Sequence, residues 1–327
     1  MNAVEIEGLA KSFGSTRAVE GVDLVVPAGS VYGLLGPNGA GKTTTIRILA
    51  TLIRPDRGTA RVFGHDVVHQ PGEVRRLVSL TGQFASMDAD MTGLENLFLI
   101  GRLLGLKRAE AKARGRQLLE VFDLHQAGKR RVATYSGGMR RRLDVAASLV
   151  TRPRVLFLDE PTTGLDPESR GQVWQIVRSL VAEGTTVLLT TQYLEEADRL
   201  ADRIAVIDSG RVIAEGSSDE LKASVGSATL HLTLGDAGQR IETERLLRET
   251  TGHGLAQATD PKIVDVPISD PGLATSAVAA LFRHGIALAE ITMTRPTLDE
   301  VFLALTGHPT RTDDEPTDAP GRENDAA

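Results

Sequence analysis

Residues 36–43 are the feature that most restricts the fold, because they read Gly-Pro-Asn-Gly-Ala-Gly-Lys-Thr and match the pattern G-x-x-x-x-G-K-[ST]. The unbroken apolar run 31–35 before them predicts a buried strand, and the residues from Lys42 onward predict a helix. Glycines let such a loop bring successive backbone N–H groups close to phosphate oxygens, and the positive end of the following helix attracts the same anions. The segment therefore predicts a phosphate-binding loop; the alternative is a glycine-rich turn between a strand and a helix.

The pattern also assigns a role to single residues of this loop. Lys42 is expected to contact the β- and γ-phosphates of a nucleotide, and the Thr43 hydroxyl is expected to bind Mg²⁺. The residues expected to surround the phosphates are Gly36, Pro37, Asn38, Gly39, Ala40, Gly41, Lys42, Thr43 and Thr44.

Two carboxylates follow a second apolar run, residues 155–158, at Asp159 and Glu160. An unbroken apolar strand is typical of a parallel sheet that is covered on both faces, and ligands of such sheets bind at the carboxyl ends of the strands. We therefore expect Asp159 to hold Mg²⁺ and Glu160 to polarise an attacking water molecule. The alternative is a strand that ends in a solvated turn.

A second anion site is predicted by Ser136, Gly137 and Gly138, which open a helical pattern. A chain with two phosphate sites of this kind resembles the ATP-binding subunits of ABC transporters, whose signature is Leu-Ser-Gly-Gly-Gln. This sequence keeps the Ser-Gly-Gly core and has Tyr135 and Met139 at its flanks. Contact between this core and a phosphate is expected to remain, whereas the contacts of the family's glutamine side chain are not.

The resemblance implies ATP and Mg²⁺ as ligands and assigns further residues. Phe13 resembles the aromatic residue that stacks on adenine, although a single phenylalanine is more often a core residue. Gln83 resembles the glutamine that binds the metal site and links it to the helical block, although alone it would read as a solvated polar residue. Asp166, in Gly164-Leu165-Asp166, resembles the loop residue that contacts the opposite subunit.

The family's switch region is similar to residues 190–198, but Gln192 stands where its histidine is usual. An amide can donate a hydrogen bond to a γ-phosphate but cannot become charged near neutral pH. We therefore predict that hydrolysis persists, with Lys42, Glu160 and Gln192 as the catalytic residues.

Three details narrow the resemblance to the daunorubicin/doxorubicin-resistance type of ATP-binding subunit: Tyr135, Gln192 and residues 297–307. This type implies a head-to-tail homodimer with ATP sandwiched between subunits, and a separate multi-span permease. It further implies a peripheral position on the cytoplasmic side of the membrane and export of a hydrophobic compound, such as an antibiotic-like drug or a lipid. The compound itself is not encoded here, because in this arrangement the permease contacts it.

The expected fold is α/β: a P-loop NTPase cassette of the ABC type with a smaller C-terminal α/β domain. The cassette is expected over residues 1–221, with an antiparallel β layer near its start, a mixed central sheet and a helical subdomain at about 86–150. The accessory domain is expected over 222–307. Residues 308–327 have no apolar period and are expected to be disordered.

Composition limits the alternatives. The 327 residues carry a net charge of −6 and no cysteine, so neither a field that attracts nucleic acid nor a disulfide framework is expected. No apolar run approaches the roughly 18 residues of a membrane span. The basic clusters 129–131 and 140–142 are expected to be solvated; alternatively, one arginine reaches a phosphate or a neighbouring subunit.

Two other functions remain open. One is a soluble ATP-driven switch, although such proteins usually carry two cassettes or a long coiled coil, and neither pattern occurs here. The other is a regulatory subunit that hydrolyses ATP weakly because of Gln192.

Overall fold

The fold is taken from a computed structural model that describes residues 1–81, 87–226, 228–252, 260–268 and 270–306. Gln83 and the tail 308–327 lie outside this part of the chain. Internal contacts divide the chain into two compact units, the first Met1–Ser218 and the second Asp219–Gly307, whereas the sequence predicts this boundary after Leu221. Within the described ranges, no helix is long and apolar enough to cross a membrane.

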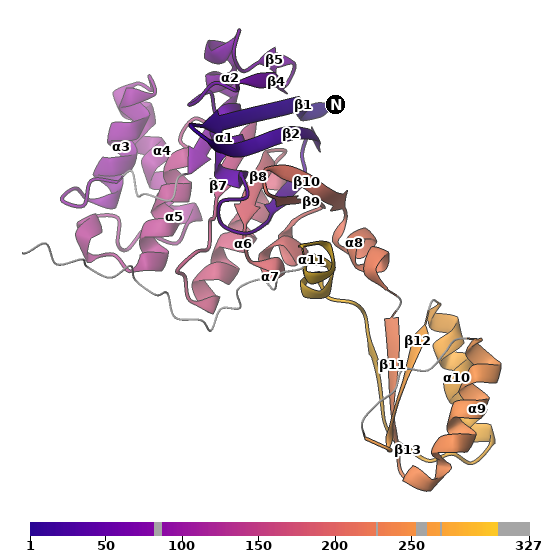
Figure 1. The fold of residues 1–327 in the computed structure, drawn as a ribbon. Helices are drawn as coiled ribbons and strands as arrows, with labels where there is room; N and C mark the ends of the chain where they lie inside the picture. The colour runs from indigo at the N-terminus through magenta and orange to yellow at the C-terminus, as the bar shows by residue number, and fades with distance from the viewer. Residues whose placement is uncertain (82–86, 227, 253–259, 269, 307–327) are drawn as a thin grey trace, which may run out of the picture. The chain divides into compact units, whose positions relative to one another are not determined.

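A six-stranded mixed sheet is the centre of the first unit (Figure 1). Its order is β10-β9-β3-β8-β7-β6, in which all neighbours are parallel except β9 and β10. The strands are β3 Val31–Leu35, β6 Val78–Thr81, β7 Val155–Asp159, β8 Thr186–Thr191, β9 Arg203–Asp208 and β10 Arg211–Gly216. Because β3, β7 and β8 are parallel, their carboxyl ends meet at one edge of the sheet.

The apolar runs that predicted these strands are buried on both faces. In β7, Val155 and Phe157 pack into one hydrophobic cluster, while Leu156 and Leu158 pack into another. The first cluster lies against α1 (Lys42–Leu49) and an antiparallel sheet, and the second against helices. Successive side chains of a strand point to opposite faces, so a strand between two cores must be apolar at every position.

The antiparallel sheet has the order β2-β1-β4-β5 and consists of β1 Asn2–Phe13, β2 Thr16–Pro27, β4 Arg57–Val62 and β5 His65–Asp66. Val22, Leu24 and Val26 of β2 are buried, whereas the residues between them are exposed. This period of two is typical of a sheet with one covered face. The helix α2 (Pro71–Leu77) connects the sheet to β6.

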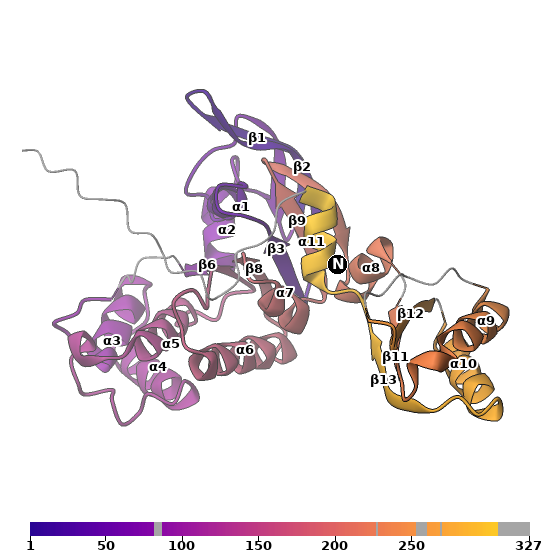
Figure 2. The same cartoon turned by 60° about the horizontal axis from the view of Figure 1, so that its bottom comes forward.

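The predicted helical block is formed by α3 Gly93–Leu103, α4 Arg108–Val121, the short 3₁₀ helix η1 Val132–Thr134 and α5 Gly137–Ser148 (Figure 2). A capping box begins α3: the Thr92 hydroxyl accepts from the Glu95 N–H at 3.2 Å, and the Glu95 carboxylate accepts from the Thr92 N–H at 2.8 Å. Next, α6 Pro167–Ala182 and α7 Leu194–Leu200 pack on the central sheet.

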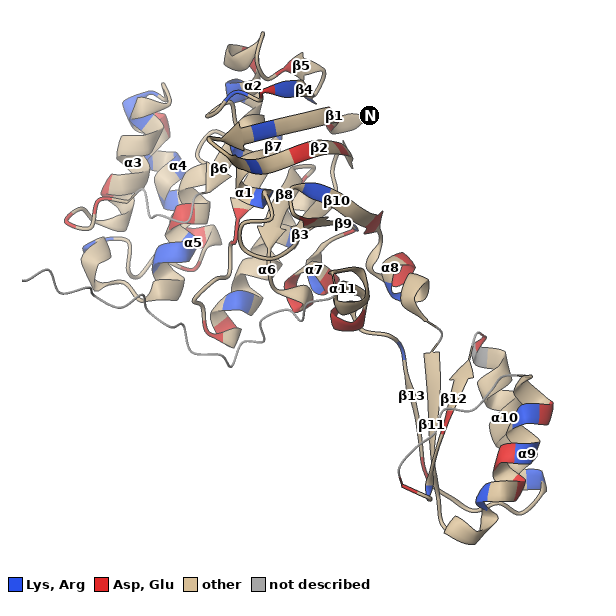
Figure 3. Cartoon of the chain, viewed as in Figure 1, with Lys and Arg blue, Asp and Glu red and all other residues tan. Residues whose placement is uncertain are grey.

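The second unit contains a three-stranded antiparallel sheet of order β12-β11-β13. Leu230, Leu232, Val264 and Val266 on one face of this sheet share a core with its two longest helices. Figure 3 shows charges of both signs along α9, where Arg245 pairs with acidic side chains one turn away on each side. The elements are α8 Ser218–Val225, β11 Ala228–Leu234, η2 Ala237–Gln239, α9 Arg240–Thr251, β12 Ile263–Ile268, α10 Pro271–Arg283, β13 Leu288–Thr294 and α11 Leu298–Thr306.

Candidate functional site

The loop between β3 and α1 can form only with glycine at two of its positions. A Cβ on Gly36 would lie 2.1 Å from the Ile207 carbonyl oxygen. Gly41 has φ +103°, and a Cβ there would lie 2.2 Å from the Ala18 carbonyl oxygen. The loop is therefore pressed against the backbone of β2 and β9, and Gly41 begins α1 without any side chain over the first N–H groups of the helix.

The side chain of Lys42 folds back into the loop of residues 36–41. Its side chain is 4 % exposed, and its Nζ donates to the carbonyl oxygens of Gly36 at 2.7 Å and Pro37 at 2.9 Å. Burial lowers the pKa of Lys42, while the charges of Glu160 and Asp159 act in the opposite direction. The ammonium group is thus held at the centre of the loop, beside two carboxylates, where a phosphate chain can replace the carbonyl contacts.

Three oxygen-bearing side chains meet at the carboxyl edge of the sheet. The hydroxyl of Thr43 donates to Asp159 Oδ1 at 3.0 Å, and the hydroxyl of Thr190 donates to the same atom at 2.6 Å. Mg²⁺ prefers one or two carboxylate or hydroxyl oxygens and keeps several waters. The residues present therefore fit this ion: Thr43 and Asp159 would hold it, and it would neutralise charge on the phosphates.

Glu160 stands in a backbone conformation that is rare for a residue with a side chain, with φ +47°. Its N–H donates both to the carbonyl oxygen and to the hydroxyl of Thr190 at 3.1 Å. Its carboxylate, 8 % exposed, accepts from the Thr163 hydroxyl at 3.2 Å. The turn thus places Glu160 directly after Asp159, with its carboxylate held by Thr163 of the same loop.

The predicted second anion site begins α5. The Ser136 hydroxyl caps the helix by accepting from the Met139 N–H at 3.2 Å. Gly137 has open space around it, whereas a Cβ on Gly138 would lie 2.4 Å from the Ser169 hydroxyl oxygen at the start of α6. The glycine at 138 is therefore required by packing within the chain, and the one at 137 leaves room for a ligand.

The two unusual flanks of this motif face inward. Tyr135 is buried and donates to the Ala127 carbonyl oxygen at 2.8 Å, and Met139 packs against the helical core. Both side chains support the helical block.

The expectation that residues 140–142 are solvated is wrong for two of the three arginines. Only Arg140 is exposed. Arg141 turns inward and donates to the Pro161 carbonyl oxygen at 2.7 Å and to those of Asp159 and Glu160 at 3.0 and 3.2 Å. Arg141 and Arg142 belong to a run of three arginines. Such a run reads as a solvated face, so the sequence held no signal for these contacts. The expectation of exposure holds for residues 129–131.

The remaining predicted residues have different surroundings. Phe13 ends β1 and is 52 % exposed, so the core placement is wrong and its ring is open to a ligand. Gln192 follows β8 and is partly buried. Asp166 caps α6, and its carboxylate accepts from the Ser169 N–H at 2.9 Å. Gln83 falls outside the described residues.

A buried acid not predicted from the sequence lies beside Thr162, in the loop that follows β7. Glu196 of α7 is 1 % exposed, and its Oε1 accepts from Trp174 Nε1 of α6 at 3.2 Å. The hydroxyls of Thr191 and Thr162 also lie close to this carboxyl. Burial raises the pKa of this carboxyl.

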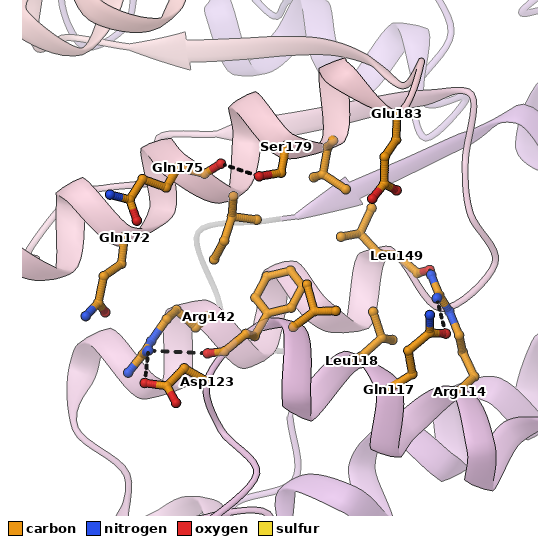
Figure 4. A pocket seen from close by; sticks show the side chains of 14 residues that line it. Arg114, Gln117, Leu118, Asp123, Arg142, Leu149, Gln172, Gln175, Ser179 and Glu183 are labelled. Carbon is orange, nitrogen blue, oxygen red and sulfur yellow. Dashed lines mark hydrogen bonds and ion pairs between the residues drawn. The ribbon is translucent and has the colours of Figure 1, made fainter.

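A groove of about 410 Å³ lies between α4, α5 and α6 and contains none of the predicted nucleotide residues. Figure 4 shows Gln172, Gln175 and Ser179 along α6 on one side, facing Arg142 beside Asp123. Arg142 donates to the Phe122 carbonyl oxygen at 3.3 Å. This groove separates the helical block from α6 and is distinct from the phosphate loop.

Comparisons with known proteins agree with this geometry. The family pattern described as ABC transporter matches residues 19–163. The chain is 58% identical, over 99% of its length and 98% of the relative's, to the daunorubicin/doxorubicin resistance ATP-binding protein of Streptomyces peucetius. It is 47% identical, over 94% of its length and 95% of the relative's, to the doxorubicin resistance ATP-binding protein of Mycobacterium tuberculosis.

A solved structure of the ATP-binding subunit of an ABC transporter matches with a TM-score of 0.61 and 29% identity, covering 68% of this chain and 92% of that one. The predicted cassette fold is confirmed by this match, because the loop, the mixed sheet and the helical block occur in one arrangement. The chain therefore belongs to the ABC transporter family of ATP-binding proteins, whose members are ATPases.

Proposed function

We propose that this chain binds ATP with Mg²⁺ and hydrolyses it to drive export of a hydrophobic, drug-like compound through a separate membrane permease. The observation that carries this proposal is the near full-length identity to a protein named for daunorubicin and doxorubicin resistance, together with the buried Lys42 in its loop. ATP-binding subunits of ABC exporters as a class dimerise and pair with membrane permeases. The exported compound would contact the permease rather than this chain.

The chemistry at one site uses residues from three strand ends. Lys42 binds the β- and γ-phosphates, Thr43 and Asp159 hold Mg²⁺, and Glu160 orients the attacking water. Gln192, directly after β8, donates its amide to the γ-phosphate. Charge stabilisation and positioning supply most of the rate in such phosphoryl transfers, so a neutral amide is sufficient at this position.

The site is completed by a second copy of the chain. Ser136 and Gly137 stand at the start of α5, and in this proposal they are too far from the loop of residues 36–44 in the same chain to share one nucleotide with it. A head-to-tail homodimer brings these residues onto the ATP held by the partner's loop, and Asp166 lies at this interface. A twofold axis then creates two equal sites.

Adenine recognition falls to Phe13. The ring is 52 % exposed, and Lys11 Nζ lies 5.6 Å from its centroid, so a base can stack on the free ring face. Gln83 is proposed to contact the metal and to report its state to the helical block. We place the dimer peripherally on the cytoplasmic side of the membrane, where ATP and the permease are both available, and propose no nucleic-acid partner.

Transport in inverted membrane vesicles tests this function. The chain is co-expressed with a candidate multi-span permease, and accumulation of doxorubicin is followed after ATP is added. Uptake is expected with wild type and not with Lys42→Ala at equal expression. ATP turnover without any uptake of a hydrophobic compound, and unchanged by the membrane protein, would instead favour a soluble ATP switch.

A further inference from the structure

Arg141 connects two functional segments of the same subunit. It lies on α5, the helix that begins at Ser136, and its guanidinium donates to three successive carbonyl oxygens, those of Asp159, Glu160 and Pro161. A planar guanidinium can satisfy several acceptors in fixed directions, which an ammonium group cannot. The side chain is largely buried, and burial lowers the pKa of Arg141 while the nearby acids Asp144 and Glu196 oppose this.

The loop that receives these hydrogen bonds needs external support. Glu160 has φ +47°, a conformation that costs a non-glycine residue free energy and persists only where the surroundings enforce it. From β8, Thr190 fixes the Glu160 N–H. From α5, Arg141 fixes the carbonyl oxygens on the other side. The direction of the Glu160 carboxylate therefore depends on the position of α5.

The other end of this connection is the anion site at Ser136. Residues 136 to 141 belong to one capped, continuous helix, so a shift at its first turn moves Arg141 as well. The start of α5 is closely packed, because a Cβ on Gly138 would lie 2.4 Å from the Ser169 hydroxyl oxygen of α6. A shift of the start of α5 would therefore move the segment Asp159 to Pro161, because Arg141 on this helix is hydrogen-bonded to it.

We propose that Arg141 is a positioning residue that couples the two ATP sites of the dimer. This inference rests on the sandwich proposed above, in which Ser136 of a subunit touches the ATP on its partner's loop while Glu160 of that subunit acts on its own ATP. When ATP on the partner's loop binds the start of α5, this helix shifts. Arg141 of the same subunit then positions Glu160 at that subunit's own ATP. Each site then reaches full turnover only when the other is occupied.

Mixed dimers separate the two sites. Two differently tagged full-length chains are combined with ATP and purified over both tags. The second subunit carries either Glu160→Gln, whose loop binds ATP without hydrolysing it, or Lys42→Ala, whose loop does not bind ATP. All turnover then comes from the first subunit, which is wild type or Arg141→Met, and turnover is measured at protein concentrations that saturate dimer formation.

With a wild-type first subunit, emptying the second site is expected to lower turnover by at least about fivefold. With Arg141→Met, kcat is already lower by about 10- to 100-fold, since Glu160 is misplaced, while KM for ATP changes little. Emptying the second site is then expected to cause no further fall in kcat of this variant. The proposal would be overturned if the ratio of turnover with the second site occupied to turnover with it empty were equal for wild type and Arg141→Met. It would also be overturned if wild-type turnover did not depend on the second site.

Controls distinguish this result from a failure of the dimer or of folding. Ser136→Arg in the second subunit should abolish turnover of the first; surviving turnover would overturn the shared site, and with it the coupling. If Ser136→Arg abolishes this turnover, but emptying the second site lowers turnover equally for wild type and Arg141→Met, only the role of Arg141 is overturned. Arg140→Met, on the exposed neighbour, is expected to keep the wild-type ratio. If Arg141→Met does not fold, Arg141→Lys replaces it, with an intermediate ratio expected.

Discussion

Single residues of the phosphate loop are fixed by backbone contacts as much as by the ligand. Gly36→Ala would place a Cβ 2.1 Å from the Ile207 carbonyl oxygen, which cannot move without disturbing β9. We expect a loss of ~1–3 kcal/mol in the free energy of unfolding and weaker ATP binding. Chemical denaturation and nucleotide titration measure both. Gly171→Ala in α6, with open space around it, is the control and should gain ~1 kcal/mol.

Glu160 is the residue whose substitution separates binding from hydrolysis. Glu160→Gln keeps the size of the side chain and removes the carboxylate that orients water, so turnover should fall about 10²- to 10⁴-fold. ATP contacts through Lys42 remain, and the dimer should persist on gel filtration with ATP and Mg²⁺. A variant that elutes as a monomer under these conditions would contradict the proposed sandwich.

Gln192 is expected to support hydrolysis without a titrating group. Gln192→Ala removes the amide that we propose to face the γ-phosphate, and kcat should fall roughly tenfold, the effect of losing about 1.4 kcal/mol of transition-state stabilisation. Gln192→Glu, which introduces a negative charge, should reduce it further. Wild-type turnover no higher than that of Lys42→Ala, measured with the membrane partner present, would show a regulatory subunit instead.

Prediction of single residues from the sequence was possible where a backbone pattern was visible. The loop glycines, Lys42 and the carboxylates after β7 follow from spacing alone. The clamp of Arg141 on successive carbonyl oxygens and the hydroxyl of Thr190 on Asp159 depend on the fold bringing distant segments together, so no local pattern marks them. Phe13 was ambiguous for the same reason, because exposure depends on what covers the end of β1.

At the scale of elements, the buried Glu196 joins α7 to α6 through Trp174. Its pKa is raised above the ordinary 4.5 by burial, so the folded chain retains this proton where the unfolded chain has lost it. This contribution to stability is full below pH 4.5 and is lost as pH rises through the folded-state pKa. A neutral glutamine has no such dependence, and its amide can donate to the nearby Thr162 hydroxyl.

We therefore expect Glu196→Gln to change little at pH 4.5 and to be progressively more stable than wild type toward pH 8. A difference of ~1 kcal/mol corresponds to roughly 2–4 °C in Tm for a unit of this size. Thermal unfolding over this pH range measures the difference. If the difference stayed constant with pH, Glu196 would have the same pKa in the folded and the unfolded chain, and burial would not raise it.

Elements were predicted well where apolar runs were strong, as for β3 and β7. The start of α6 was predicted less accurately. The apolar spacing of residues 173–181 predicts a helix that starts at Val173, whereas α6 begins at Pro167, six residues earlier, although Asp166 before Pro167 is a typical helix start. The charges and glycine in the first turns of α6 hid this helix, because the apolar period begins only where α6 meets the sheet.

At the scale of the whole molecule, the proposed dimer gives one chain two halves of different sites. The loop of residues 36–44 with Asp159 and Glu160 forms one half, and the start of α5 at Ser136 forms the other. The sequence could predict both halves but not the path between them, since Arg141 reads as part of a solvated basic run. Coupling through α5 would make the dimer, rather than the subunit, the unit of catalysis.

Complementation between two inactive variants tests this claim most directly. Lys42→Ala lacks the loop's ammonium group, and Ser136→Arg blocks the start of α5; each alone should show no turnover. In a mixed dimer, the intact loop of one subunit meets the intact Ser136 of the other at one of the two sites. We predict that mixing restores turnover, to at most about a twentieth of wild type when subunits pair at random, because about a quarter of the sites are intact and the empty second site lowers their turnover about fivefold. No turnover after mixing, despite formation of mixed dimers, would contradict a site shared between subunits.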